Sequence, residues 1–137
     1  ETPWIYAAGG AGMPDQVVAT ADPSYALLSP RPAVAVLTDA ETASSGEAIA
    51  VAFRGRTDTR SFGAATWGVS TANSGFVLQD GAAIFLTVAT MADRDHMAYG
   101  LELVPDEVVE GGDKTGEPAT DTVLAAAVTW LEGRGCT

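Results

Sequence analysis

The sequence predicts an α/β fold, because short apolar segments typical of strands alternate with two segments that have helical periodicity. Residues 33–38 form an unbroken apolar run with β-branched residues, which is typical of a parallel strand covered on both faces. Apolar residues recur at helical spacing between positions 45 and 54 and again between 121 and 132. Strands and helices that interleave in this way indicate a sheet with helices packed against it.

The first thirty residues give a mixed pattern. Residues 4–6 are compatible with a strand, and residues 7–14 contain four Gly or Pro in eight positions, which predicts a loop. Residues 16–20 and 25–28 are compatible with two short strands or with a bent hairpin. This part of the chain therefore adds strands but no helix.

The junction between the apolar run and the first helix has two interpretations. Ser44-Ser45-Gly46-Glu47 precedes an apolar helix in the pattern of a capping box, so Ser44 could be a plain helix cap. A serine at a strand-to-helix turn also lies beside the free N–H groups of the first helical turn, which can stabilise an oxyanion. That geometry suits a nucleophile. We expect the helix to end at Gly55.

The elements after this helix follow in order. Residues 59–62 predict a strand, and the apolar segments on either side of Asp80-Gly81 predict a hairpin. Residues 101–109 predict a last extended segment. A final helix over 121–132 is predicted from its inner apolar stripe, and Gly133 should end it.

Composition excludes several classes of function. The length of 137 residues fits one domain. The net charge of −11 and the pI near 4.1 argue against nucleic acid or an anionic membrane surface as partner. No apolar run approaches the roughly 18 residues of a membrane span. One Cys and one His can form neither an internal disulfide nor a zinc cluster, and we expect no metal or cofactor. The composition suggests a bacterial protein, and both a secreted and a cytoplasmic location stay open.

Residues 42–47, Thr-Ala-Ser-Ser-Gly-Glu, lie between flanking apolar segments and resemble the nucleophile motif of the C-terminal-processing (tail-specific) serine peptidases. The resemblance is to the branch that includes the tricorn core protease and the retinoid-binding-protein repeats. Further similar motifs follow in the family's order: residues 61–68, 78–81 before 86–89, and 99–100 before 104–108.

The resemblance implies a spiral of β-β-α units of the crotonase/ClpP type, of which this chain would hold only the later units. Residues 1–137 would then be a single domain, the C-terminal portion of a serine-peptidase catalytic domain. The chain begins without Met and without the family's early glycine-rich oxyanion motif. A companion N-terminal segment or chain is therefore an expected partner, beside a peptide or protein substrate.

The resemblance also assigns residues to a site. Ser44 would be the nucleophile that attacks a peptide carbonyl, and the Ser45 N–H would be one oxyanion donor. Thr66 and Gly68 would line the cleft.

Two further residues have a role only by the resemblance. Glu102 lies 58 residues after Ser44, where tricorn-type enzymes have a supporting glutamate, but a surface carboxylate at a strand edge is the more common interpretation of such a residue. Asn73 falls where the lysine-using branch places a glutamine beside its base, but a turn residue is the more common interpretation there.

The general base is not evident in the sequence. The lysine-using branch has its base 25 residues after the nucleophile, and this chain has Val69 there. Lys114, the one lysine, lies in a glycine-rich acidic loop, and His96, the one histidine, lies in a polar loop. We therefore expect the base to come from a segment outside this chain.

Three functions are compatible with these observations. The first is a serine peptidase, tail-specific or cutting internally, that acts through an acyl-enzyme on Ser44. The second is a catalytically inactive domain of the same fold that binds a peptide or ligand or serves as a scaffold. The third is a non-peptidase enzyme on that scaffold, catalysing acyl transfer or dehydration.

Overall fold

A small parallel sheet forms the centre of the molecule. It contains β4 (Val34–Thr38), β5 (Thr59–Gly63) and β8 (Glu107–Val108) in the order β4-β5-β8. The computed structural model describes residues 4–7, 10–13, 15–20, 27, 31–112 and 117–135. Within these ranges the architecture is mixed α/β, as the sequence predicts.

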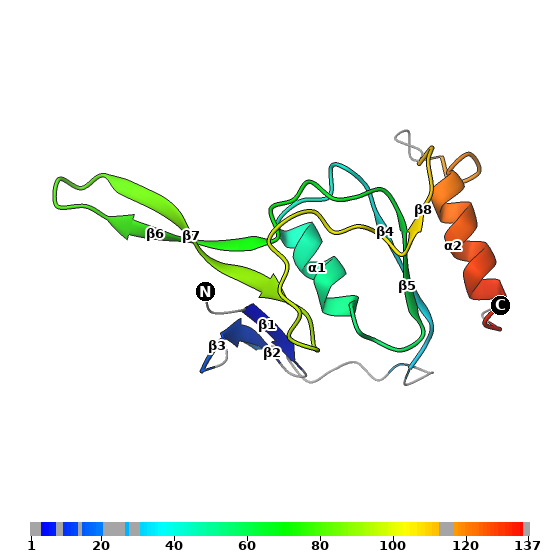
Figure 1. Ribbon diagram of the computed structural model, residues 1–137, viewed down its shortest axis with the longest axis horizontal. Coiled ribbons are helices and arrows are strands. Elements are labelled where there is room, and N and C mark those ends of the chain that lie inside the picture. The colour runs from blue at the N-terminus through cyan, green and yellow to red at the C-terminus, as the bar shows by residue number, and fades with distance from the viewer. Residues whose placement is uncertain are drawn as a thin grey trace.

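Both faces of the central sheet are covered by helices. In Figure 1 the sheet lies between α1 (Ser45–Phe53) and α2 (Thr122–Glu132). Val36 of β4 packs against the apolar cluster on the α1 side, and its neighbour Ala35 packs against the cluster on the α2 side. Successive side chains of a strand point to opposite faces, so this alternation confirms a strand buried on both sides.

The two helices begin and end as their sequence signals indicate. The Asp121 carboxylate accepts hydrogen bonds from the N–H groups of Val123 and Leu124, which caps α2. Helix α1 ends before Gly55, which has a φ of 67°, the left-handed conformation that glycine tolerates after a helix.

A second sheet has the order β3-β2-β1-β7-β6. Its strands are β1 (Trp4–Ala7), β2 (Gly10–Met13), β3 (Gln16–Thr20), β6 (Thr71–Val77) and β7 (Ala83–Ala92). The predicted hairpin at Asp80-Gly81 is confirmed by the antiparallel pairing of β6 with β7.

One expectation from local composition is wrong, and another is confirmed only in part. The loop predicted over residues 7–14 contains β2, because antiparallel pairing on both sides holds this glycine-rich segment extended. A Cβ on Gly10 would lie 2.6 Å from the Ala19 carbonyl oxygen, so glycine here permits close strand contact. The extended segment predicted over 101–109 forms a strand only at Glu107–Val108. The strand proposed for 25–28 lies outside the described residues, apart from Leu27.

The distal part of β6 and β7 projects from the rest of the molecule. We call residues 71–90 the arm; Figure 1 shows this hairpin extending well beyond the helices and the central sheet. On its other side β7 pairs with β1 only at Met91 and Ala92. The arm is therefore a two-stranded ribbon along most of its length.

Candidate active site

Ser44 lies at the turn that joins the central sheet to α1, and its side chain is exposed. Its backbone has φ 50° and ψ −107°, a conformation that non-glycine residues rarely adopt. Such a conformation costs of the order of 1–3 kcal/mol and persists only where surrounding contacts enforce it. Contacts with neighbouring residues must therefore hold this turn in its conformation.

The Glu47 carboxylate supplies that enforcement. Its side chain has 0% exposure and accepts four hydrogen bonds. Oε2 accepts from the Ser44 N–H at 2.8 Å and from the Val69 N–H at 3.0 Å. Oε1 accepts from Thr66 Oγ1 at 2.6 Å and from the Gly68 N–H at 2.9 Å. A buried carboxylate is stable only when it is satisfied in this way, so one side chain fixes both Ser44 and the facing loop.

Further hydrogen bonds connect the two loops directly. The Trp67 N–H donates to the Thr42 carbonyl at 2.9 Å, two residues before Ser44. Thr66 Oγ1, which donates to Glu47, also accepts from the Leu103 N–H at 2.9 Å. The nucleophile turn, the loop after β5 and the segment around Leu103 thus form one connected network.

Glu102 lies beside Gly68 at the edge of this network. Gly68 has a φ of 97°, and a Cβ there would lie 3.2 Å from the Glu102 nitrogen and 3.6 Å from its Oε2. The structure therefore brings Thr66, Gly68 and Glu102 to the loop that faces Ser44. The Glu102 side chain is exposed.

Asn73 lies elsewhere, on β6 at the base of the arm. Its side chain is exposed and its Oδ1 accepts a hydrogen bond from Thr87 Oγ1 at 2.9 Å. This is a cross-strand pair of the hairpin. A role for Asn73 in the site stays a prediction.

The first turn of α1 leaves the Ser45 amide available, since the Glu47 N–H faces the Ser44 side chain in the capping box. The N–H groups of Gly46 and Ala48 donate to the carbonyls of Ala43 and Ser44, and the Ser44 N–H donates to Glu47. Among the residues that the structure describes, the Ser45 N–H has no hydrogen-bond partner. It lies at the positive end of the helix dipole, where a negatively charged oxygen is stabilised.

His96, a candidate for the general base, does not lie near Ser44. His96 belongs to a turn at the opposite end of α1, where Arg94 donates to the carbonyls of Ala52 and Arg54. A helix of nine residues is about 13 Å long. Val69 is 39% exposed at the position of the lysine base, and Lys114 lies outside the described residues.

Two groups with perturbed pKa values, Asp106 and Tyr99, lie on the segment that follows β7. Partial burial alone would raise the pKa of Asp106, but hydrogen bonds from the Ser61 N–H and Oγ, with the charges of Arg54 and Arg60, hold it below its ordinary value. Burial, together with a hydrogen bond to Asp93, raises the pKa of Tyr99 to about 12. Both groups fasten the segment that follows β7 to the core.

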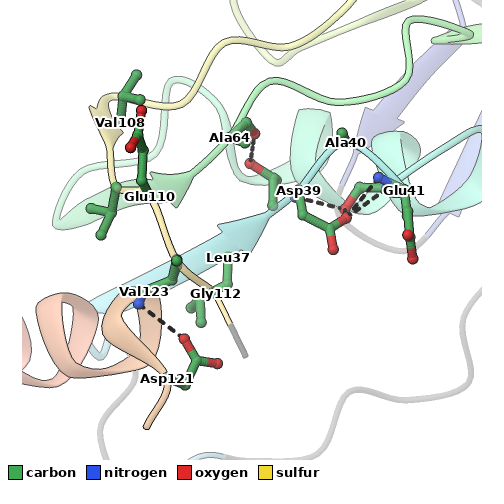
Figure 2. Close-up of a pocket in the computed structure, with 14 residues that line it drawn as sticks. Leu37, Asp39, Ala40, Glu41, Ala64, Val108, Glu110, Gly112, Asp121 and Val123 are labelled. Atoms are coloured by element: carbon green, nitrogen blue, oxygen red, sulfur yellow. Dashed lines mark hydrogen bonds between the residues drawn. The ribbon is translucent and has the colours of Figure 1, made fainter. Parts of the chain in front are cut away.

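A cavity of about 760 Å³ opens at the carboxyl end of β4. Figure 2 shows Leu37, Val123 and Asp121 on one side of it and the turn containing Asp39 and Glu41 on another. Ligands commonly bind at this end of parallel strands. The turn that lines the cavity is the one that leads to Ser44.

Within the described ranges, no group of three or more His, Cys, Asp or Glu side chains is placed to hold a metal ion. In the same ranges, none of the helices combines the length and the apolar character needed to span a bilayer.

The sequence assigns Glu47 a place in the capping box and in the motif that carries the resemblance, but no contact with the facing loop. The capping box is present, but the same carboxylate also binds Thr66, Gly68 and Val69. The one available signal was a glutamate within an otherwise apolar helical stripe, next to the motif that carries the resemblance.

The fold and the site define an α/β domain with a constrained serine at a strand-to-helix turn. The chain belongs to peptidase family S41, whose family model matches residues 6–109. A solved structure of a lipoprotein from Streptococcus agalactiae is 34% identical, with a TM-score of 0.56 over 73% of this chain. The match covers 31% of that lipoprotein chain, so this sequence spans about a third of its length. No curated protein matches.

Proposed function

We propose that this protein is a serine peptidase that acts on peptide or protein substrates, tail-specific or internally cutting, through an acyl-enzyme on Ser44. The observation that carries the proposal is the constrained Ser44 backbone, enforced by the buried Glu47 carboxylate. A plain helix cap does not require a disfavoured φ, whereas strain at a strand-to-helix turn is common at functional serines.

In the proposed reaction, Ser44 Oγ attacks the carbonyl carbon of the scissile peptide while a base takes its proton. The Ser45 N–H would stabilise the negative charge that develops on the carbonyl oxygen. The proton passes to the leaving amine, which departs and leaves an ester on Ser44. Water then hydrolyses the ester and restores the serine hydroxyl.

We place the general base outside residues 1–137. The position of His96 at the far end of α1, and Val69 in place of lysine, support this arrangement. Residues 1–137 would then be the C-terminal portion of the catalytic domain, holding the later β-β-α units of a crotonase-like spiral. Glu102 would support the base, because it borders the loop that faces Ser44.

The test is cleavage of an unfolded protein substrate by the complete protein, followed by mass spectrometry of the products. Ser44→Ala should abolish cleavage, and the neighbouring exposed serine supplies the matched control, Ser45→Ala, which keeps its backbone N–H. Cleavage that persists in Ser44→Ala would refute the proposal.

A binding or scaffold function is the second candidate. The apolar side chains of Trp67, Val69 and Leu101 are exposed beside the site, where an extended peptide could contact them. This function predicts peptide binding without turnover and the same affinity in Ser44→Ala.

A further inference from the structure

We propose that Thr66 is a positioning residue, which holds the segment that contains Glu102 at a fixed distance from the turn that contains Ser44. The inference rests on the proposed function, in which Ser44 is the nucleophile and Glu102 supports the base. Its starting point is the Thr66 hydroxyl, which joins the buried Glu47 carboxylate to the backbone beside Glu102.

Both hydrogen-bonding directions of the Thr66 hydroxyl are used. Oγ1 donates its one proton to Glu47 Oε1 at 2.6 Å and accepts the Leu103 N–H at 2.9 Å. The Thr66 N–H also donates to the Leu103 carbonyl at 3.2 Å, so these two residues are joined twice. The Thr66 side chain is 5% exposed and offers a substrate little surface. Its place in the site is therefore to hold other residues.

The Glu47 carboxylate carries this constraint on to Ser44. One of its oxygens binds Thr66, and the other accepts the Ser44 N–H at 2.8 Å. The carboxylate is planar and has 0% exposure, so bulk water does not compete for either oxygen. Three hydrogen bonds in series thus join the N–H of Ser44 to the N–H of Leu103.

The backbone is fixed on both sides of Glu102. Leu103, which follows it, is bound to Thr66, and its side chain is 2% exposed in the core. Leu101, which precedes it, has a carbonyl that accepts a hydrogen bond from Ser70 Oγ at 2.7 Å. The exposed carboxylate of Glu102 therefore extends from a backbone whose position relative to Ser44 depends on Thr66.

A second buried hydroxyl has the same bonding pattern and provides the matched control. Ser61 on β5 is 6% exposed, and its Oγ donates to the Asp106 carboxylate at 2.7 Å and accepts the Asp106 N–H at 2.9 Å. This pair belongs to the Asp106 cluster rather than to the hydrogen bonds around Glu47. Loss of the Ser61 hydroxyl should therefore lower stability without moving Glu102 relative to Ser44.

Steady-state cleavage of an unfolded protein substrate by the complete protein tests the proposal. Thr66→Val should lower kcat about 10- to 100-fold and change KM less than about threefold, because it misplaces catalytic groups without removing a substrate contact. Thr66→Ser keeps the hydroxyl and should restore kcat to within about threefold of the wild-type value. Ser61→Ala should lower the urea midpoint of unfolding, as Thr66→Val does, and leave kcat unchanged.

Amide hydrogen exchange measures the same coupling without requiring turnover. Thr66→Val should speed exchange at the Ser44 and Leu103 amides at least about 10-fold relative to the amides of α2, and Ser61→Ala should leave this ratio unchanged. The proposal is overturned if Thr66→Val keeps the wild-type kcat or the wild-type ratio, or if Ser61→Ala lowers kcat equally. A wild-type protein that does not cleave would instead contradict the proposed function, and the exchange ratio would still support or overturn the coupling.

Thr66→Ala is the second variant if Thr66→Val does not fold. Its smaller side chain admits water to the Glu47 carboxylate, and a water satisfies the oxygen without fixing the spacing between the two segments. We expect kcat to fall at least about 10-fold in this variant as well. A folded Thr66→Ala protein with the wild-type kcat would overturn the proposal.

Discussion

Two regions of the molecule depart from the usual rule that charged groups are exposed and apolar groups are buried: the site around Ser44 and the arm. At the site a carboxylate, Glu47, is fully buried and receives four hydrogen bonds. In the arm, aromatic and aliphatic side chains such as Phe85 face water. The buried charge fixes a single geometry, because each lost partner leaves a desolvated group unpaired. The arm is fixed mainly by pairing between its own strands, so its side chains are available for another surface.

The largest expected effect is at the buried carboxylate. Glu47→Ala leaves the N–H groups of Ser44, Gly68 and Val69 without an acceptor and should lower the free energy of unfolding by about 3–5 kcal/mol. Urea denaturation followed by circular dichroism measures this loss. The matched control, Glu132→Ala, removes an exposed carboxylate at the end of α2 and should change stability by less than about 0.5 kcal/mol. Equal effects of the two substitutions would contradict the role assigned to Glu47.

A phenylalanine pair compares the core with the arm directly. Phe62 has 0% exposure and lies 5.9 Å from Trp130 between ring centroids, so Phe62→Ala should cost about 3–5 kcal/mol. Phe85→Ala should cost less than about 1 kcal/mol, measured by the same denaturation at protein concentrations too low for association. A large loss in Phe85→Ala would show that the arm is part of the folded core.

Strain at Ser44 predicts a stabilising substitution. Glycine adopts a positive φ without steric cost and replaces a serine cap with a loss of only a few tenths of a kcal/mol, so Ser44→Gly should raise stability by about 1 kcal/mol. Ser45→Gly, at the first position of α1, should lower stability slightly. Thermal unfolding of both variants checks the sign. A destabilised Ser44→Gly would mean that the backbone is not strained.

The smallest effect concerns pH. The pKa of Asp106 is held below its ordinary value, so its hydrogen bonds with Ser61 stabilise the protein above the unfolded pKa of about 4. This contribution is lost as the pH falls through the lower folded pKa. Asp106→Asn should therefore cost about 1 kcal/mol at pH 7 and less at pH 3, in urea denaturation at the two values. An equal cost at both values would exclude this linkage.

Local patterns predicted the elements that depend on neighbours in sequence. Hydrophobic period and turn chemistry predict the doubly covered β4, the two helices and the turn at Asp80-Gly81. Strand β2 did not follow, because its glycines suggest a loop and only its partners β1 and β3 hold it extended.

The site was predictable only in part. The resemblance selects Ser44, Thr66, Gly68 and Glu102, which the structure places in three adjoining segments: the turn before α1, the loop after β5 and the segment around Leu103. The role of Glu47 depends on groups 19 to 22 residues further along the chain, so no local pattern contains it. Exposure of the arm is likewise a tertiary property, since its consecutive apolar residues suit strands that are covered on both faces.

The most direct test of Ser44 as a nucleophile is a mass spectrum of the native protein after treatment with a fluorophosphonate, with peptide mapping of any adduct. The account predicts one adduct, on the peptide that contains Ser44, and none in Ser44→Ala when the base-bearing segment is present. A complete protein that contains this segment and acquires no adduct would contradict the account and favour a binding or scaffold function.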